Sequence, residues 1–161
     1  MFWVGLLIVH GLVAFLLLGA VTHQAVSTTW RPASKRQFIM SFASVRAAAY
    51  TNAVVALFMI NFAFGAALYA NYSAAAKTEL ILLKWLPTIG LFELKEHSAL
   101  IGLALLPTYW LLWKKVPLDD KTALRTWATL LLAALVWWAF LVGHIVNNTR
   151  GIAEQMVAWA F

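Results

Sequence analysis

Four long stretches of the chain carry no Lys, Arg, Asp or Glu, and they determine the expected fold. The stretches are 1–30, 47–76, 97–113 and 126–149. A helix that crosses a bilayer needs about 20 mostly apolar residues, so each stretch can supply one crossing. The pattern predicts an all-α fold, a bundle of four transmembrane helices over about 2–21, 47–70, 93–113 and 122–146. We interpret residues 1–161 as a single integral-membrane domain.

Polar and mixed segments between these stretches predict where the helices end. Residues 77–92 alternate charged and apolar side chains and are too interrupted to cross a membrane. We expect a short interfacial helix there, lying on the membrane surface and broken at Pro87. The polar run 22–24 is expected to end the first helix, and the run 147–151 to end the fourth.

Composition supports a membrane protein and limits the chemistry of any cofactor. The chain is 63% hydrophobic, with a mean hydropathy of +0.81 and a net charge of +6. It has no cysteine, which excludes disulfides, thiolate-bound iron–sulfur clusters and c-type haem attachment within the chain. The basic residues lie in short loops between apolar stretches, so we do not expect a nucleic-acid partner. The expected surroundings are a lipid bilayer.

Positive charge is distributed unequally between the two sides of the expected bundle. The side that holds both termini carries Lys77, Lys84, Lys95 and Arg150. The other side carries more, namely Arg31, Lys35, Arg36, Arg46, Lys114, Lys115, Lys121 and Arg125. Because cytoplasmic loops hold the excess of Lys and Arg, we expect both termini to be extracytoplasmic. The expected location is a bacterial inner membrane.

Histidines are the ionisable residues that remain inside or at the ends of the apolar stretches. A titratable side chain in hydrocarbon is costly and often marks a ligand or a relay. His97 and His144 lie about 6 Å and 5 Å inside the extracytoplasmic face, at a rise of about 1.5 Å per residue. His10 lies about 12 Å from the same face, and His23 lies at the opposite end of its helix.

Two imidazoles at matching depth on facing helices suit the axial positions of a haem iron. The sequence therefore predicts that His97 and His144 bind a haem b near the extracytoplasmic face, with His10 as the alternative ligand. Cationic and amide side chains at that face can pair with the propionates, and the candidates are Lys95, Arg150 and Asn147. One haem is expected; a second would need His10 together with a non-histidine ligand or a partner subunit.

A non-haem metal site is the alternative. Glu93 and His97 are four residues apart and share a helix face. With His10 and His144 they form a nitrogen and oxygen ligand set that suits copper, zinc or iron. Copper is the alternative cofactor expected at this site. A further alternative is a cofactor-free accessory subunit of a membrane complex, in which the histidines only bridge helices.

These histidines give the chain a resemblance to small four-helix integral-membrane cytochromes that bind haem b between helices. His97, His144 and His10 carry the resemblance, which is architectural and covers the four expected helices. It implies electron transfer to or from a periplasmic or membrane redox partner, or a quinone, by a subunit of an oxidoreductase complex that is not itself catalytic. Copper-resistance membrane proteins are similar in outline and would imply copper handling instead.

Overall fold

The computed structural model describes residues 1–29 and 46–160, with the side chains of all of these except 150 and 152–160. This part of the chain is helical and holds no strand, which confirms the expected all-α class. The elements are α1 (Phe2–Thr29), the 3₁₀ turn η1 (Ala47–Ala49), α3 (Thr51–Asn71), the π-helical turn η2 (Tyr72–Ala76), α4 (Lys77–Leu82), α5 (Leu86–Lys114) and α6 (Thr122–Ala160). The basic loop residues Arg31, Lys35 and Arg36 lie outside the described residues.

Three stretches of the described chain are long and apolar enough to cross a membrane. They are Phe2–Thr29, Thr51–Leu82 and Thr122–Thr149. Most of their side chains face outward, as expected of helices whose surroundings are lipid. This finding supports association with a bilayer, while α5 is more polar because Glu93, Lys95 and Glu96 lie within it.

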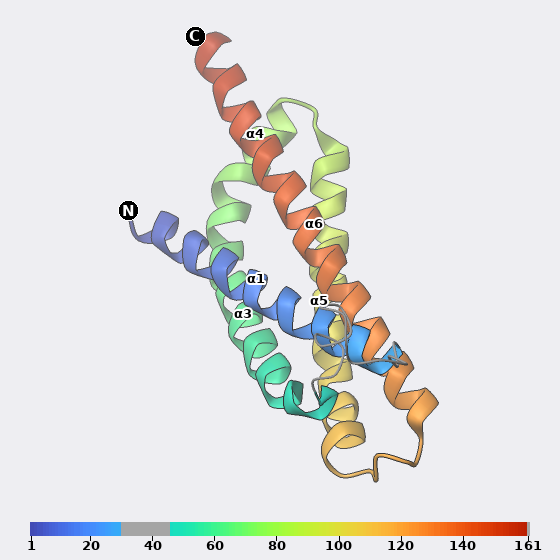
Figure 1. Cartoon of the computed structure of the whole chain (residues 1–161). Helices are drawn as coiled ribbons and strands as arrows, with labels where there is room; N and C mark the ends of the chain where they lie inside the picture. Colours follow the sequence, from blue (N-terminus) through green and yellow to red (C-terminus); the bar gives the residue numbers. More distant parts are fainter. Residues whose placement is uncertain (30–45, 161) are drawn as a thin grey trace, which may run out of the picture.

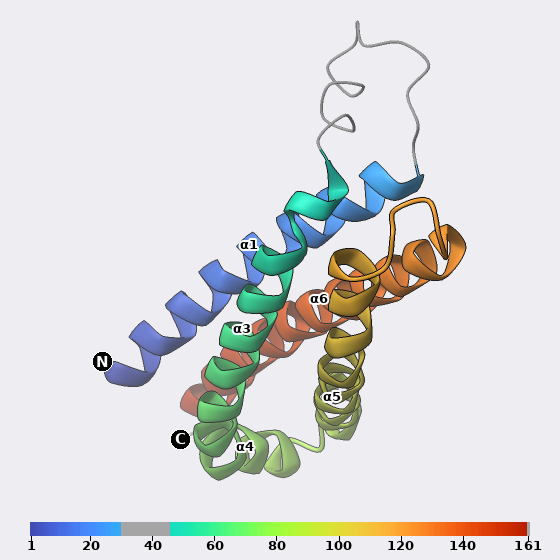
Figure 2. The same cartoon turned by 90° about the horizontal axis from the view of Figure 1, so that it is seen from below.

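The four long helices α1, α3, α5 and α6 pack side by side (Figure 1). Helix α1 contacts α3 and α6, and α5 contacts α6 and α3, so that the helices surround a common centre. In Figure 2, α4 and the two termini lie toward one end, and the α5–α6 connection lies toward the other. We call these the α4 end and the loop end.

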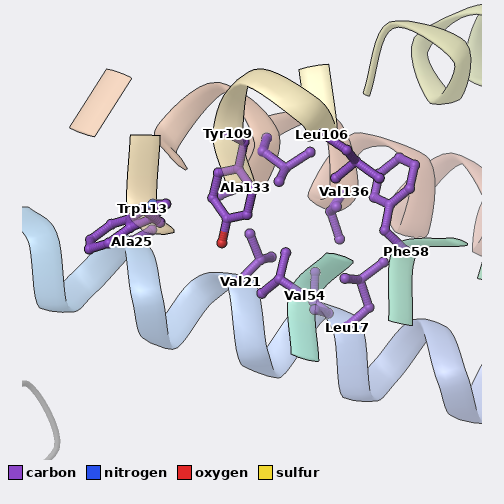
Figure 3. Close-up of a cluster of buried hydrophobic side chains, with 12 residues drawn as sticks. Leu17, Val21, Ala25, Val54, Phe58, Leu106, Tyr109, Trp113, Ala133 and Val136 are labelled. Atoms are coloured by element: carbon purple, nitrogen blue, oxygen red, sulfur yellow. The ribbon is translucent and has the colours of Figure 1, made fainter. Parts of the chain in front are cut away.

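The best-packed part of the structure is the half nearer the loop end. All four long helices contribute buried side chains to one cluster there (Figure 3). The cluster consists of Leu17, Leu18, Val21, Ala25, Val54, Phe58, Leu106, Tyr109, Trp113, Leu132, Ala133 and Val136. Within lipid such helices associate through close packing and interhelical hydrogen bonds, because lipid tails are as apolar as the side chains.

A glycine allows α3 and α5 to approach closely in this half. The Phe58 ring lies against Gly102, and a Cβ atom added at Gly102 would be 2.7 Å from Phe58 Cζ. That separation is shorter than any ordinary van der Waals contact. Residue 102 must therefore be small for this ring to lie between the two helices.

Buried polar side chains in the same half find partners on neighbouring helices. The Tyr109 hydroxyl donates to Gln24 Oε1, and Gln24 Nε2 donates to Thr51 Oγ1 at 3.4 Å. Trp113 Nε1 donates to Thr129 Oγ1 at 3.1 Å. These contacts link α5 to α1, α1 to α3 and α5 to α6, and they satisfy groups that would be costly to leave unpaired.

Arg125 closes the connection between α5 and α6. Only 3% of the residue is exposed, and its guanidinium lies 5.3 Å from the centre of the Trp113 ring. It donates hydrogen bonds of 2.8–3.3 Å to four backbone carbonyls, those of Leu112, Val116, Pro117 and Leu118. The planar guanidinium presents several donors at once, so a single side chain fixes the whole loop.

The predicted end of the first helix is wrong. Helix α1 continues past Val21 to Thr29. The hydroxyls of Ser27, Thr28 and Thr29 donate to backbone carbonyls in the preceding turn, at 2.7–3.0 Å. Hydroxyl side chains that bond backward in this way are compatible with a helix.

The predicted bounds of the interfacial helix over 77–92, and its break at Pro87, are also wrong. Helix α4 covers only Lys77–Leu82 and continues α3 through the π-helical turn. Lys84 adopts a positive φ of 59° in the turn that follows, and α5 begins at Leu86, before the expected start at 93. Pro87 lies in the first turn of α5, where its missing N–H would have no helical partner, so it starts a helix and does not break one.

The remaining helix boundaries also differ from those expected. Helix α6 runs through Asn147 and Gly151 to Ala160, so the predicted end near 146 is wrong. Thr149 Oγ1 donates to the Ile145 carbonyl at 2.8 Å, and no proline interrupts the run. Helix α3 begins at Thr51, four residues after the expected start at 47, because Ala47–Ala49 form a 3₁₀ turn.

Candidate functional site: a cavity between four helices

The half of the bundle nearer the α4 end is hollow. A cavity of about 440 Å³ lies between the first half of α1, the second half of α3, the first half of α5 and the portion of α6 around 135–147. Small-molecule and cofactor sites typically measure roughly 300–1,000 Å³. The cavity is therefore large enough for a ligand of that class.

Three polar atoms buried at this cavity have no hydrogen-bond partner among the residues that the structure describes. They are His10 Nδ1, Asn61 Oδ1 and the Tyr72 hydroxyl, and all three residues line the cavity. Leaving a buried polar group unpaired costs about 1–3 kcal/mol. The packed half of the bundle pairs Tyr109, Gln24 and Thr51 with one another, whereas these three atoms face a cavity, which makes the hollow half a candidate ligand site.

One face of α3 forms a continuous wall of the cavity. Asn61, Gly65, Tyr69 and Tyr72 recur at intervals of three or four residues, which places them on one side of the helix. The eleven steps along the helix from Asn61 to Tyr72 correspond to about 16 Å along the axis. Unpaired polar atoms therefore occur both deep in the bundle and close to the α4 end.

Small residues on two walls leave room for a flat ligand. Gly65 on α3 lies against the His10 ring, and an added Cβ would be 3.5 Å from His10 Cε1. Gly143 on α6 lines the cavity, and an added Cβ there would have no neighbour within 4 Å. Phe62 and Phe140 line the same cavity and give it apolar, aromatic walls.

The structure brings two of the four histidines to the cavity. His10 on α1 and His144 on α6 both line it. His97 is exposed outside it, in a smaller surface pocket, with Nδ1 2.7 Å from the Glu93 carbonyl oxygen one turn earlier. His23 lies in the packed half, with its ring 4.6 Å from that of Tyr50. The predicted pair of His97 and His144 is thus not brought to one cavity, whereas His10 and His144 are.

The structure describes the side chains of two of the three residues predicted to pair with the haem propionates. Lys95 and Asn147 line the cavity. Lys95 Nζ is 2.8 Å from Glu96 Oε1 and 4.5 Å from the centre of the Phe92 ring. The side chain of Arg150 lies outside the described part of the chain.

The alternative metal site is not assembled in the described residues. Glu93 does not line the cavity, and its carboxylate pairs with Lys77 Nζ at 2.8 Å. Among the side chains that the structure describes, no group of three or more His, Asp or Glu is placed to hold a metal ion.

Sequence reasoning missed several residues of the cavity wall. Tyr72 stacks on Phe92 with ring centres 3.8 Å apart, and Phe92 stacks on Tyr69 at 6.0 Å. Asn61 also lines the cavity, and its side-chain oxygen has no partner among the described residues. The available signal was the spacing of Asn61, Gly65, Tyr69 and Tyr72 along a single helix face.

No protein-family model matches the chain, and comparisons with curated proteins and with solved structures give no significant match. The functional argument therefore depends on the cavity and on the side chains that line it.

Proposed function

We propose that this protein is a membrane-bound electron-transfer subunit that holds one haem b in the cavity between α1, α3, α5 and α6. The observation that carries the proposal is that His10 on α1 and His144 on α6 line one cavity, in which His10 Nδ1 has no partner among the described residues. An imidazole nitrogen that is buried and unpaired suits an iron ligand. The proposal takes His10 with His144, and not His97 with His144, as the axial pair.

The other cavity residues fit the remaining parts of a haem. The apolar rings of Phe62 and Phe140 suit the porphyrin faces, and the small Gly65 and Gly143 leave room beside them. Lys95 and Asn147 suit the propionates as charged and amide partners. When bound, a haem b supplies one-electron oxidation and reduction at its iron. The chain's own contribution is to hold the ring, exclude water from its faces and balance the charge of its carboxylates.

The proposal includes four membrane crossings with both termini extracytoplasmic. Helix α5 has 29 residues and is about 44 Å long, which exceeds the roughly 30 Å of a bilayer core. Its charged residues Glu93, Lys95 and Glu96 then lie at the outer surface, and Lys114 and Lys115 lie at the cytoplasmic surface. This orientation agrees with the positive-inside rule.

Electron transfer also requires a donor and an acceptor outside this chain. The cavity lies toward the α4 end, so a periplasmic redox protein, a membrane partner subunit or a quinone would exchange electrons there. We therefore propose a subunit of an oxidoreductase complex.

The test is a reduced-minus-oxidised visible spectrum of protein purified from a native membrane in mild detergent, for the wild type and two glycine variants. Gly143→Leu places a side chain on the cavity wall, whereas Gly19→Leu adds the same side chain to the exposed face of α1, outside the cavity. We expect a haem b spectrum in the wild type and in Gly19→Leu, and its loss in Gly143→Leu. A colourless wild type that carries copper would refute the haem and support the metal-handling alternative.

A further inference from the structure

Two opposite charges occupy the cavity wall near the α4 end. Lys95 and Glu96 are the only Lys, Arg, Asp or Glu among the described residues that line the cavity. The Lys95 side chain is only 15% exposed and that of Glu96 is 29% exposed, and their charged ends are 2.8 Å apart. Lys95 also lies over the Phe92 ring, which itself lines the cavity.

This pairing is unusual for its position in the helix. Side chains of adjacent helical residues point about 100° apart and do not normally face each other. Here both side chains bend so that the ammonium and the carboxylate meet at the cavity wall. The positive charge of Lys95 is therefore already matched by a carboxylate of the same chain.

A ligand carboxylate that approaches Lys95 must compete with that of Glu96. It must displace Glu96 from the ammonium, and it meets the repulsion of the Glu96 charge at close range. Asn147 is a neutral cavity residue and offers no such competition. The affinity for a ligand without a carboxylate would not depend on the pair of Lys95 and Glu96.

We propose that Glu96 is a specificity-determining residue that acts as an internal competitor for Lys95 and so weakens the hold of the cavity on ligands that carry a carboxylate. This inference rests on the proposed function, because it takes the propionates of haem b as the carboxylates concerned. Glu96 then makes haem retention weaker than the other cavity contacts alone would make it.

The test is a spectroscopic titration of the haem-free protein in detergent with two probes, haemin and haemin dimethyl ester, whose carboxylates are neutralised. The variants are Glu96→Gln, Lys95→Gln and the double variant. Glu79→Gln is the control, because Glu79 lies on α4, at the same end of the bundle, but does not line the cavity. Binding of the ester also reports whether the cavity of each variant is intact.

We expect Glu96→Gln to bind haemin about two- to fivefold more tightly, a change typical of a partly exposed ion pair. Lys95→Gln should weaken haemin binding by a similar factor and reduce the effect of Glu96→Gln, because only the direct repulsion of the Glu96 charge then remains. The ester should bind all four proteins and Glu79→Gln with the same affinity.

Two results would overturn the inference, and they are distinguishable. If the wild type binds both probes and Glu96→Gln behaves like Glu79→Gln, or tightens both probes equally, the competition is refuted and the proposed function stands. If the wild type binds neither probe, the proposed function is refuted and the inference falls with it.

Discussion

The contact between Phe58 and Gly102 makes the arrangement of α3 and α5 testable by adding a single methyl group. In Gly102→Ala the new Cβ would be 2.7 Å from Phe58 Cζ and 3.0 Å from Cε2, where an ordinary contact begins at 3.4 Å. The methyl is therefore about 0.7 Å too close to a ring that is only 6% exposed. Overpacking of this kind costs about 1–3 kcal/mol.

The matched control lies on the same helix. Gly90 is exposed on α5 and has no neighbour within 4 Å of an added Cβ. Replacing a helical glycine with alanine stabilises by up to about 1 kcal/mol in both variants. The difference between Gly102→Ala and Gly90→Ala therefore isolates the packing term.

Thermal unfolding in detergent, followed by the fluorescence of the nine tryptophans, is the assay. At about 2–4 °C per kcal/mol, Gly102→Ala should unfold roughly 2–12 °C below Gly90→Ala. Phe58→Leu removes the clashing ring atoms, so Gly102→Ala should no longer destabilise in that background. Equal midpoints for the two alanine variants, with or without Phe58, would refute the packing of α3 on α5 described here.

Two further predictions concern the packed half of the bundle. Arg125→Met should lower the free energy of unfolding by about 2–4 kcal/mol, because four carbonyls lose a charged donor. The stability of Arg125→Lys should fall between that of Arg125→Met and that of the wild type. Unchanged unfolding midpoints would contradict the role of Arg125 in fixing the α5–α6 loop. Tyr109→Phe should lower the free energy of unfolding by about 0.6–1.7 kcal/mol, because Gln24 Oε1 loses its donor. Gln24→Leu should then lower it less in the Tyr109→Phe background than in the wild type. Additive effects in this double-mutant cycle would show that the Tyr109–Gln24 hydrogen bond contributes nothing.

The helical class was predictable from the sequence because long charge-free stretches leave few other structures possible in lipid. Helix ends were less predictable, since polar residues do not end a helix that offers them partners. The hydroxyls of Ser27, Thr28 and Thr29 bond to carbonyls of their own helix, and Gln24 is paired inside the bundle. In the sequence, Pro87 was compatible either with a break in a helix or with the first turn of one. The turn at Lys84, just before it, distinguishes these two structures.

The site was predictable only in part, because depth along a helix can be counted but direction around it cannot. His97 and His144 have matching depths, yet His97 lies outside the cavity and bonds to its own helix. In a soluble helix the apolar face identifies the interior. In α5 apolar residues occur all round the helix, so the sequence did not indicate that Lys95 faces the cavity while His97 does not.

The central claim, that the cavity holds a haem between His10 and His144, is tested most directly by the haem-to-protein ratio of four single variants. Each histidine is replaced by alanine, the proteins are expressed in a native membrane, and haem is quantified after purification. The account predicts that His10→Ala and His144→Ala lose the haem, while His23→Ala and His97→Ala retain it. Loss in His97→Ala with retention in His10→Ala would contradict the account and place the ligand outside this cavity.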